Sequence, residues 1–394
     1  MLVTINANEF KNAVKKLAIV STAKGTLSIT GAIQCAYDGE GIFTMTTTNL
    51  YQQHTIRFNG VCTGEQPCKF TIDCNKVNKL LTCIKTTNVV MDYDEQTNKV
   101  VLHIGAKITF DSLTDADFYE FDVSAESSES TSLVFVQSSL KTALDKVFWA
   151  SEKKDDGRKA LLGICFDINA EDNAITMVAT NSKYLATYTI KSTQGIVING
   201  SGGKIVIPND AVKSIDTLDG ASVSVRFTSK YAIFTSGNDI FITKVIEGNF
   251  PNYKMVIPDK TMYGYRTDTK QFIKELKSVQ KIIKVMEVES PKIKFTLSDV
   301  SVKMTVLIHS YMTRTADKEA GIEQIAHMPY VTTEHLPVDF EFSFNPELLV
   351  DILTSFEGEV TWGINSDTSP FVFTGDDNYK VIGMPIPLKP NTED

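Results

Sequence analysis

The residue types that most often carry chemistry in proteins are sparse and scattered in this sequence. Cys62, Cys68 and Cys74 are separated from one another by five residues, whereas paired zinc ligands are separated by about two to four. The five histidines lie apart, without an HExxH or HxH pair. We therefore expect buried or incidental thiols at these positions, and no bound metal.

The glycine-rich segment from Gly200 to Lys204 is a second candidate, because such loops bind phosphate groups when a lysine follows. A phosphate-binding loop needs its first glycine where this chain has Ile198, and it needs Ser or Thr where this chain has Ile205. The segment also leads into a strand-like run, whereas a phosphate loop opens a helix. We expect a hairpin or a connecting loop.

Acidic pairs at Asp92 and Asp94, and at Asp115 and Asp117, lack the further ligands and the turn glycine of a calcium loop. No segment combines a nucleophile, a base and an orienting residue. The sequence therefore favours a protein without a reaction of its own and without a cofactor. An enzyme whose active site is dispersed along the chain stays open as an alternative.

Composition favours a folded protein with several domains. The chain has 394 residues, of which 42% are hydrophobic and 22% charged, and this length exceeds one ordinary core. The first residues lack the basic and apolar regions of a signal peptide. No apolar run reaches the roughly 18 to 20 residues of a membrane helix. We expect a soluble, cytoplasmic protein.

A threefold repeat organises the chain. Apolar residues at helical spacing predict helices over 8–20, 138–150 and 270–285, whose starts lie 130 and 132 residues apart. Each is followed by strand-like runs, a second helix and further strands, and the second helices are predicted over 75–85, 209–218 and 345–356. This pattern predicts an α+β fold with domains over 1–123, 130–258 and 262–390, joined by linkers over 115–129 and 258–268.

Positive charge is concentrated in the six predicted helices. With short flanks included, the six helices together carry a net charge of +8. Because the net charge of the whole chain is −9, the remaining residues carry −17. Lysines on a single helix are usually just its solvated face. Their concentration on one type of element in several repeats favours a surface that binds phosphates without reading bases.

The segment from Glu247 to Pro258 is an unusual linker. It turns on Gly248 and Pro251 and then presents Tyr253, Met255, Val256 and Ile257. Apolar side chains between prolines either pack under a domain or form a binding surface. The sequence leaves both possibilities open.

Four segments resemble the bacterial DNA sliding clamps, the beta subunits of DNA polymerase III. They read LLGICF over 161–166, VATNSKYLA over 178–186, IEGNFPNY over 246–253 and IGMPIPL over 382–388. The resemblance implies three clamp domains, each with two helices on one side and antiparallel β-sheet on the other, which form half of a ring. It also implies that two chains, head to tail, encircle duplex DNA without a cofactor.

The resemblance further implies a hydrophobic pocket into which polymerases and the clamp loader insert short peptides. The family commonly has Thr-Asp-Gly-His-Arg-Leu where this chain has Thr-Asn-Ser-Lys-Tyr-Leu at 180–185. The implied pocket residues are Leu161, Thr180, Ser182, Lys183, Tyr184, Leu185, Pro251, Val256, Ser369, Pro370, Ile382, Met384, Pro385 and Ile386.

Two further sets of residues follow from the resemblance and from position. The expected DNA contacts are Lys24, Lys153, Lys154, Arg158, Lys159, Lys204 and Lys281. The expected dimer contacts are Ile108 and Phe110 of one subunit against Ile282 and Ile283 of the other. The alternative without a ring is an interaction scaffold of duplicated α+β domains.

Overall fold

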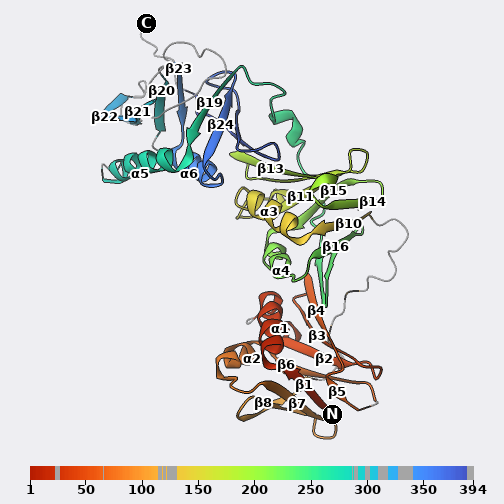
Figure 1. Cartoon of the computed structure of the whole chain (residues 1–394). Coiled ribbons are helices and arrows are strands. Elements are labelled where there is room, and N and C mark those ends of the chain that lie inside the picture. Colours follow the sequence, from red (N-terminus) through yellow and green to blue (C-terminus); the bar gives the residue numbers. More distant parts are fainter. Residues whose placement is uncertain are drawn as a thin grey trace. The chain divides into compact units, whose positions relative to one another are not determined.

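The computed structural model divides the chain into two compact units (Figure 1). Unit 1 comprises Met1–Leu144, Cys165–Ile175 and Ile190–Gly248, and unit 2 comprises Asp145–Ile164, Thr176–Thr189 and Asn249–Asp394. The described residues are 1–22, 27–64, 66–113, 118, 121, 131–285, 287, 292–297, 302–308, 318–326 and 340–387. The three domain boundaries stay a prediction. No described helix is long and apolar enough to cross a membrane.

Each of the six predicted helices has a counterpart among the described residues, although the second helices of the first two repeats are shorter than predicted, and the repeat is visible in their spacing. The first helices of the repeats begin at residues 7, 137 and 269, again at intervals of 130 and 132. They are α1 (Ala7–Val20), α3 (Gln137–Phe148) and α5 (Thr269–Val285). The second helices are α2 (Cys74–Leu80), α4 (Val212–Asp216) and α6 (Pro346–Thr354).

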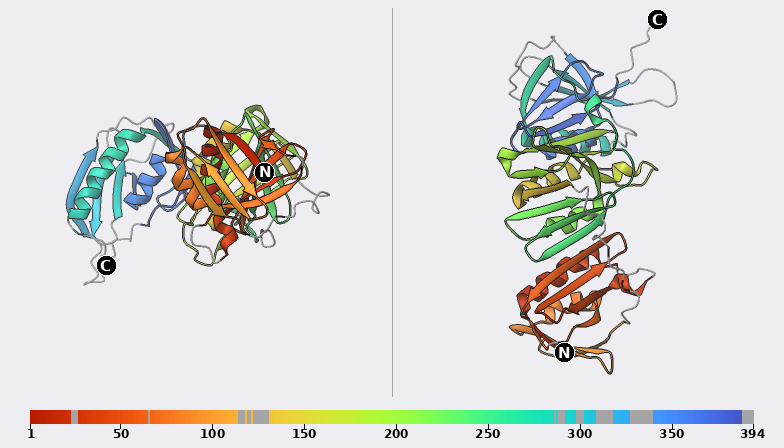
Figure 2. Two further views of the ribbon diagram at one scale, coloured as in Figure 1. Left: turned by 90° about the horizontal axis from the view of Figure 1, so that it is seen from below. Right: turned by 90° about the vertical axis from the view of Figure 1, so that its right-hand side faces the viewer.

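Each long helix is held by an apolar stripe on one face. In α5, Phe272, Leu276, Val279 and Ile283 are buried at the three-four spacing of a helix. The Phe272 ring contacts Phe295 and Trp362, with ring centroids 6.2 and 5.1 Å away. Figures 1 and 2 show α5 lying across the face of its sheet, with α6 beside it in Figure 1. This packing leaves the opposite face of α5 to solvent.

Unit 1 contains two antiparallel sheets, ordered β5-β1-β7-β8-β9 and β14-β10-β16-β17-β18-β4-β3-β2-β6. Its strands are β1 (Leu2–Asn6), β2 (Ala32–Tyr37), β3 (Ile42–Thr48), β4 (Gln52–Asn59), β5 (Cys62–Thr63), β6 (Cys68–Asp73), β7 (Asn88–Asp94), β8 (Lys99–His103), β9 (Lys107–Asp111), β10 (Thr131–Val136), β14 (Ile196–Asn199), β16 (Ser222–Phe227), β17 (Tyr231–Ser236) and β18 (Asp239–Lys244). The nine-stranded sheet joins sequence from the first two repeats through the pairing of β4 with β18.

Unit 2 contains a sheet ordered β22-β21-β20-β23 and a run of strands ordered β13-β26-β25-β24-β19. Their bounds are β13 (Tyr184–Lys191), β19 (Tyr263–Asp268), β20 (Lys292–Leu297), β21 (Val302–Ile308), β22 (Lys318–Ala326), β23 (Phe340–Phe344), β24 (Glu359–Ile364), β25 (Phe371–Thr374) and β26 (Tyr379–Gly383). The remaining strands are β11 (Gly163–Asn169), β12 (Ala174–Thr180) and β15 (Gly203–Pro208). Here β13 pairs with β26 and joins the second repeat to the third.

The linker predicted over 258–268 is partly wrong. Its second half is strand β19, which pairs with β24 from Tyr263 opposite Ile364 to Asp268 opposite Glu359. The strands β1 and β10 hold the same place before their helices and were also not predicted. Most of the linker predicted over 115–129 lies outside the described residues. Within it, Phe121 is buried against Tyr231, Ile233 and Ile242.

The segment 247–258 is partly buried and partly exposed, and its role as a binding surface stays a prediction. Phe250 and Tyr253 are 6% and 5% exposed and their rings meet edge to face. Tyr253 begins the 3-10 turn η7 (Tyr253–Val256), and Phe250 lies three residues before it. In the same turn, Met255 and Val256 are 82% and 46% exposed. The aromatic residues therefore anchor the segment, and the aliphatic residues that follow are left to solvent.

The segments that suggested chemistry have structural explanations. Residues 200–202 connect β14 to β15, as expected for a connecting loop. A side chain at Gly202 would place its Cβ 2.6 Å from the Ile168 carbonyl oxygen, so close packing accounts for this glycine. Burial, with a smaller effect of the nearby Cys68 thiol, raises the pKa of Cys62 to about 12. Among the described residues, no group of His, Cys, Asp and Glu is placed to hold a metal.

Candidate functional site

The turn between β12 and β13 is the structural centre of the expected pocket. The Thr180 hydroxyl donates to the Tyr184 carbonyl oxygen at 2.7 Å and accepts from the Ser182 amide at 3.2 Å. The Asn181 side chain accepts from the amides of Lys183 and Tyr184 at 3.0 and 3.2 Å. Two short polar side chains thus satisfy the backbone of the turn and fix its shape.

Strand pairing brings together the apolar part of the expected pocket, all of which lies in unit 2. Leu185 on β13 is opposite Ile382 on β26, and these residues are 5% and 3% exposed. Leu161, in the 3-10 turn η4 (Lys159–Leu162), is 2% exposed. Buried residues of this kind form the floor of a site, and they also belong to the core of the unit.

Other expected pocket residues are more accessible. Met384, which follows β26, is 44% exposed, and Val256 is 46% exposed. Pro251, Ser182 and Lys183 are exposed, whereas Ser369, Pro370 and Ile386 are half-buried and Pro385 is buried. The exposed apolar groups at Met384 and Val256 supply the surface that a hydrophobic peptide needs.

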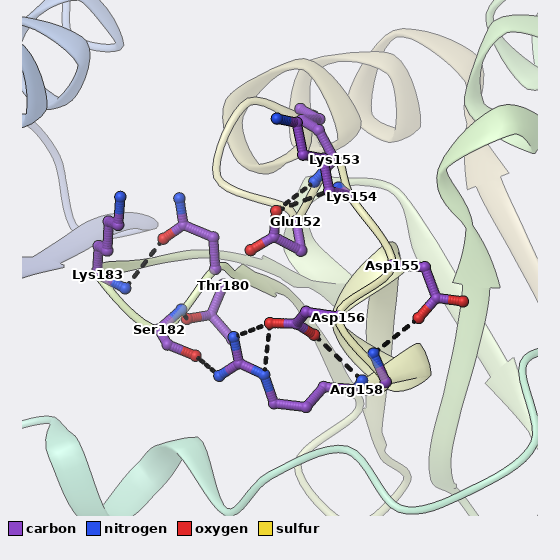
Figure 3. A network of polar contacts seen from close by, with 11 residues as sticks. Glu152, Lys153, Lys154, Asp155, Asp156, Arg158, Thr180, Ser182 and Lys183 are labelled. Atoms are coloured by element: carbon purple, nitrogen blue, oxygen red, sulfur yellow. Dashed lines mark hydrogen bonds and ion pairs between the residues drawn. The ribbon is translucent and has the colours of Figure 1, made fainter.

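Arg158 belongs to this turn, although the sequence suggested a DNA contact. Its Nε donates to Asp156 Oδ2 at 3.0 Å, its Nη2 also donates to Asp156, and its Nη1 donates to the Ser182 hydroxyl. Figure 3 shows the guanidinium lying between Asp156 and the turn that carries Ser182. The hydrogen bond from Arg158 holds the pKa of the Asp156 carboxyl below its ordinary value.

The other lysines expected to contact DNA fall into different environments. Lys153 Nζ donates to the Phe148 carbonyl oxygen and the Ser151 hydroxyl, both at 2.9 Å, and lies 4.1 Å from the centre of the Phe148 ring. Burial lowers its pKa. Lys153 therefore caps the end of α3. Lys154, Lys159 and Lys204 are exposed, and Lys24 lies outside the described residues.

Helix α5 carries a line of lysines, of which only Lys281 was singled out from the sequence. Lys270, Lys274, Lys277 and Lys281 repeat at helical spacing, are exposed, and line a groove of about 500 Å³. Their spacing of four, three and four residues was visible in the sequence and predicts one face of a helix. This line is the strongest candidate for contacts with phosphates among the described helices.

Four of the five lysines on α1 and α3 contact residues of their own unit, and the fifth, Lys15, is exposed. Lys16 is paired with Asp239 and Asp219, Lys141 is paired with Asp216, and Lys11 and Lys146 donate to carbonyl oxygens. Net charge by helix therefore overstated the basic surface on α1 and α3. A lysine used in an internal ion pair contributes little to the field that a phosphate meets.

The expected dimer contacts are also unequal. Ile108 and Phe110 line a groove of about 720 Å³ together with Lys76 and Lys79 of α2, and Phe110 is only 7% exposed. On α5, Ile282 is 37% exposed, whereas Ile283 is 6% exposed and belongs to the stripe that packs against its own sheet. The surface that a second chain could reach thus involves Ile108 and Ile282, and we assign Ile283 to the core.

Comparisons with known proteins agree with this architecture. Residues 135–252 match the profile of the DNA polymerase III beta subunit, central domain. The beta sliding clamp of Streptococcus pneumoniae is 25% identical over 292 residues, which cover 72% of this chain and 71% of that protein. The chain is thus similar to beta sliding clamps over about 70% of its length. The repeat of helices and strands runs beyond the matched central domain.

Solved clamp structures share the fold over nearly the full chain. The DNA polymerase III beta subunit of Pseudomonas aeruginosa superposes with a TM-score of 0.81 at 19% identity, covering 98% of this chain and all of that one. The Helicobacter pylori clamp bound to a DNA ligase peptide superposes with a TM-score of 0.79 at 18% identity over 98% of this chain and all of that one. Within this clamp fold, Ser182 has a φ of 72°, in the left-handed region that favours glycine. The serine stands where the family commonly has glycine.

Proposed function

We propose that this protein is a DNA sliding clamp, a processivity factor with no reaction of its own. Two chains form a head-to-tail ring around duplex DNA, and the ring tethers a DNA polymerase by a peptide held in the pocket of unit 2. A clamp loader opens the ring and uses the same pocket. Lysines without base-reading partners suit a protein that has to slide, because they neutralise phosphates at any sequence.

The observation that carries this proposal is the extent of the fold match. A repeat of helices and sheets that covers 98% of the chain also covers the whole of a solved beta subunit. The peptide-bound Helicobacter pylori clamp supports a peptide as the ligand of the pocket. The lysine line on α5 supports the DNA contact, because it is the exposed face of one of the repeated long helices.

The ring predicts a dimer, and its oligomeric state is the first test. Light scattering should give twice the 43.6 kDa of one chain at micromolar concentration, and particle images should show a central hole. Ile282→Asp should give monomers, because a charge would be desolvated in the seam. Ile19→Asp, at a similar exposure of 38% on α1, should remain dimeric. A monomeric wild-type protein would contradict ring closure.

The topological claim needs a test of its own. When loaded on a nicked circular plasmid, the protein should stay bound through gel filtration at high salt and should be lost after the plasmid is cut. The double variant Lys274→Glu with Lys277→Glu should load less and lower the salt dependence of binding to a short duplex. The control pair, Lys191→Glu with Lys380→Glu, changes exposed strand lysines by the same charge. Equal retention on circular and linear DNA would favour a scaffold without a ring.

A further inference from the structure

The rim of the pocket contains an arginine that is held from two sides. Of the five N–H donors of a guanidinium, Arg158 directs two to Asp156 and one to Ser182. Two donors are left over, one on each terminal nitrogen. The Arg158 side chain is 51% exposed, so these donors are within reach of a ligand.

The loop before Arg158 is shaped by its own carboxylates. Asp155 accepts from the Gly157 amide at 2.9 Å, and Asp156 accepts from the Arg158 amide at 3.1 Å. Gly157 has a φ of 93°. Because Asp156 binds both the backbone and the side chain of Arg158, it limits the rotamers that the arginine adopts (Figure 3). Pre-ordering of this kind lowers the entropy that a ligand contact would otherwise lose.

Ser182 contributes the third contact at the expense of backbone strain. A side chain in the left-handed region is disfavoured, and glycine would avoid the strain. The hydroxyl of Ser182 accepts a hydrogen bond from Arg158 that glycine could not accept. The strained serine is thus explained by what it does for the arginine.

We propose that Ser182 and Asp156 are positioning residues that hold Arg158 as a hydrogen-bond donor to the backbone carbonyl oxygens of the partner peptide. The inference rests on the peptide pocket proposed above. A neutral acceptor is favoured over a carboxylate, because Asp156 already neutralises the guanidinium charge. The rim therefore recognises the peptide by hydrogen bonds to its backbone, and the apolar residues of the pocket recognise its side chains.

The test uses the full-length protein and the DNA ligase peptide seen with the Helicobacter pylori clamp, labelled for fluorescence anisotropy. Arg158→Ala should weaken binding about tenfold, and Ser182→Ala and Ser182→Gly should each weaken it about threefold to fivefold. Ser182→Gly should be more stable to urea than Ser182→Ala, because only glycine relieves the strain. In the Arg158→Ala background, Ser182→Ala should have no further effect on the Kd.

Two controls separate positioning from a general structural effect. Arg266→Ala removes another exposed arginine of unit 2, which is paired with Glu359 at 3.5 Å, and should leave the Kd unchanged. The ratio of the Arg158→Ala and wild-type Kd values should stay constant as salt is raised, because the acceptor is uncharged; a ratio that collapses with salt would show carboxylate recognition and overturn the proposal. Additive effects of Ser182 and Arg158 would also overturn it. If the wild-type protein binds no peptide, the pocket itself is wrong.

Discussion

At two places in the chain, a strand of one repeat pairs with a strand of the next. We call these pairings junctions; they have the same backbone arrangement and different side chains. In unit 1, β4 pairs with β18 from Gln52 opposite Thr243 to Ile56 opposite Asp239. In unit 2, β13 pairs with β26 from Tyr184 opposite Gly383 to Tyr188 opposite Tyr379. The β4 and β13 positions differ by 132 residues, close to the interval of 130 between the first helices of the first two repeats.

The turn before each junction is also the same. Thr48 donates to the Gln52 carbonyl oxygen and accepts from the Leu50 amide, as Thr180 does for Tyr184 and Ser182. Leu50 has a φ of 73°, and Ser182 has a φ of 72°. The backbone of the turn is therefore a property of the repeat, and it does not by itself make a binding site.

The side chains at the two junctions differ in chemistry. In unit 1, Asp239 accepts from Lys16 at 2.9 Å and pairs with the fully buried His54 at 3.0 Å. In unit 2, Tyr379 stands at the equivalent position, accepts from Trp149 Nε1 at 3.0 Å and donates to the Ser355 hydroxyl at 2.7 Å. The first junction is therefore stabilised by contacts of a carboxylate with basic side chains, and the second by aromatic rings whose polar groups are hydrogen-bonded.

The surfaces beside the turns also differ, and this difference supports the position of the proposed pocket. Lys244 is the last residue of β18 and follows the part of that strand that pairs with β4. Its Nζ lies 5.2 and 5.9 Å from the ring centres of Tyr51 and Phe121. At the matching place after β26, Met384 is 44% exposed. The repeated backbone offers a turn at both junctions, and the side chains leave an accessible apolar surface beside the second.

The largest effect is expected from Asp239→Ala. The Asp239 side chain is 7% exposed, and its removal leaves the buried His54 without this partner and Lys16 with only the exposed Asp219. Breaking a buried pair from one side costs about 3–5 kcal/mol, which urea unfolding of the full-length protein should detect. The control is Asp219→Ala, which removes a 77% exposed partner of the same lysine and should cost less than about 1 kcal/mol. Equal losses would show that burial does not decide the strength of this junction.

The same group predicts the acid sensitivity of unit 1. Burial raises the pKa of Asp239, but hydrogen bonds from His54 and Lys16 lower it more, so that the pKa in the folded state lies below the ordinary value of 3.8. Its stabilising contribution is therefore complete above about pH 4 and is lost as the pH falls through the folded pKa. The Asp239→Asn variant should show a weaker fall in stability between about pH 4 and pH 2.

A third prediction concerns the accessible surface. Met384→Glu should weaken binding of the DNA ligase peptide more than about thirtyfold, since a hot-spot residue contributes about 2 kcal/mol or more. Lys244→Glu, the matching change at the first junction, should leave the peptide Kd unchanged. Both variants should keep the oligomeric state of the wild-type protein. A similar loss in the two variants would show that peptides bind at both junctions.

A smaller change is expected from Tyr379→Phe. This substitution keeps the ring and removes two hydrogen bonds, which together are worth about 1–3 kcal/mol. Because the lost bonds involve no carboxylate, the difference from wild type should not vary between pH 3 and pH 7 in urea unfolding. A pH-dependent difference would mean that the aromatic junction also has a charged contact.

The sequence predicted the helices well because their cores are local. Phe10, Ala13, Val14 and Leu17 lie on one face of α1, and this spacing is visible without a fold. It failed at β19, whose sequence YGYRTD contains a glycine and charged residues. That segment is a strand because β24 lies beside it, and a partner about 100 residues away leaves no local signal.

The candidate site was predicted in the same uneven way. Motifs at 178–186 and 382–388 indicated both sides of the pairing between β13 and β26. The sequence could not show that Arg158 is engaged by Asp156 and Ser182, because the Ser182 contact spans 24 residues. It did contain the lysine line of α5, but net charge per helix concealed it.

The smallest effect is expected from Leu50→Gly, which tests whether the two turns share one source of strain. Leu50 and Ser182 have nearly the same φ. The side chain of Leu50 is a hydrocarbon, however, so it accepts no hydrogen bond that would offset the backbone strain. Glycine should therefore stabilise unit 1 by about 0.5 kcal/mol, after the added freedom of the unfolded chain is subtracted. Urea unfolding in parallel with Ser182→Gly, which relieves the same strain but loses the bond to Arg158, should show the larger gain for Leu50→Gly. A larger gain for Ser182→Gly would mean that the Arg158 contact contributes nothing to the turn.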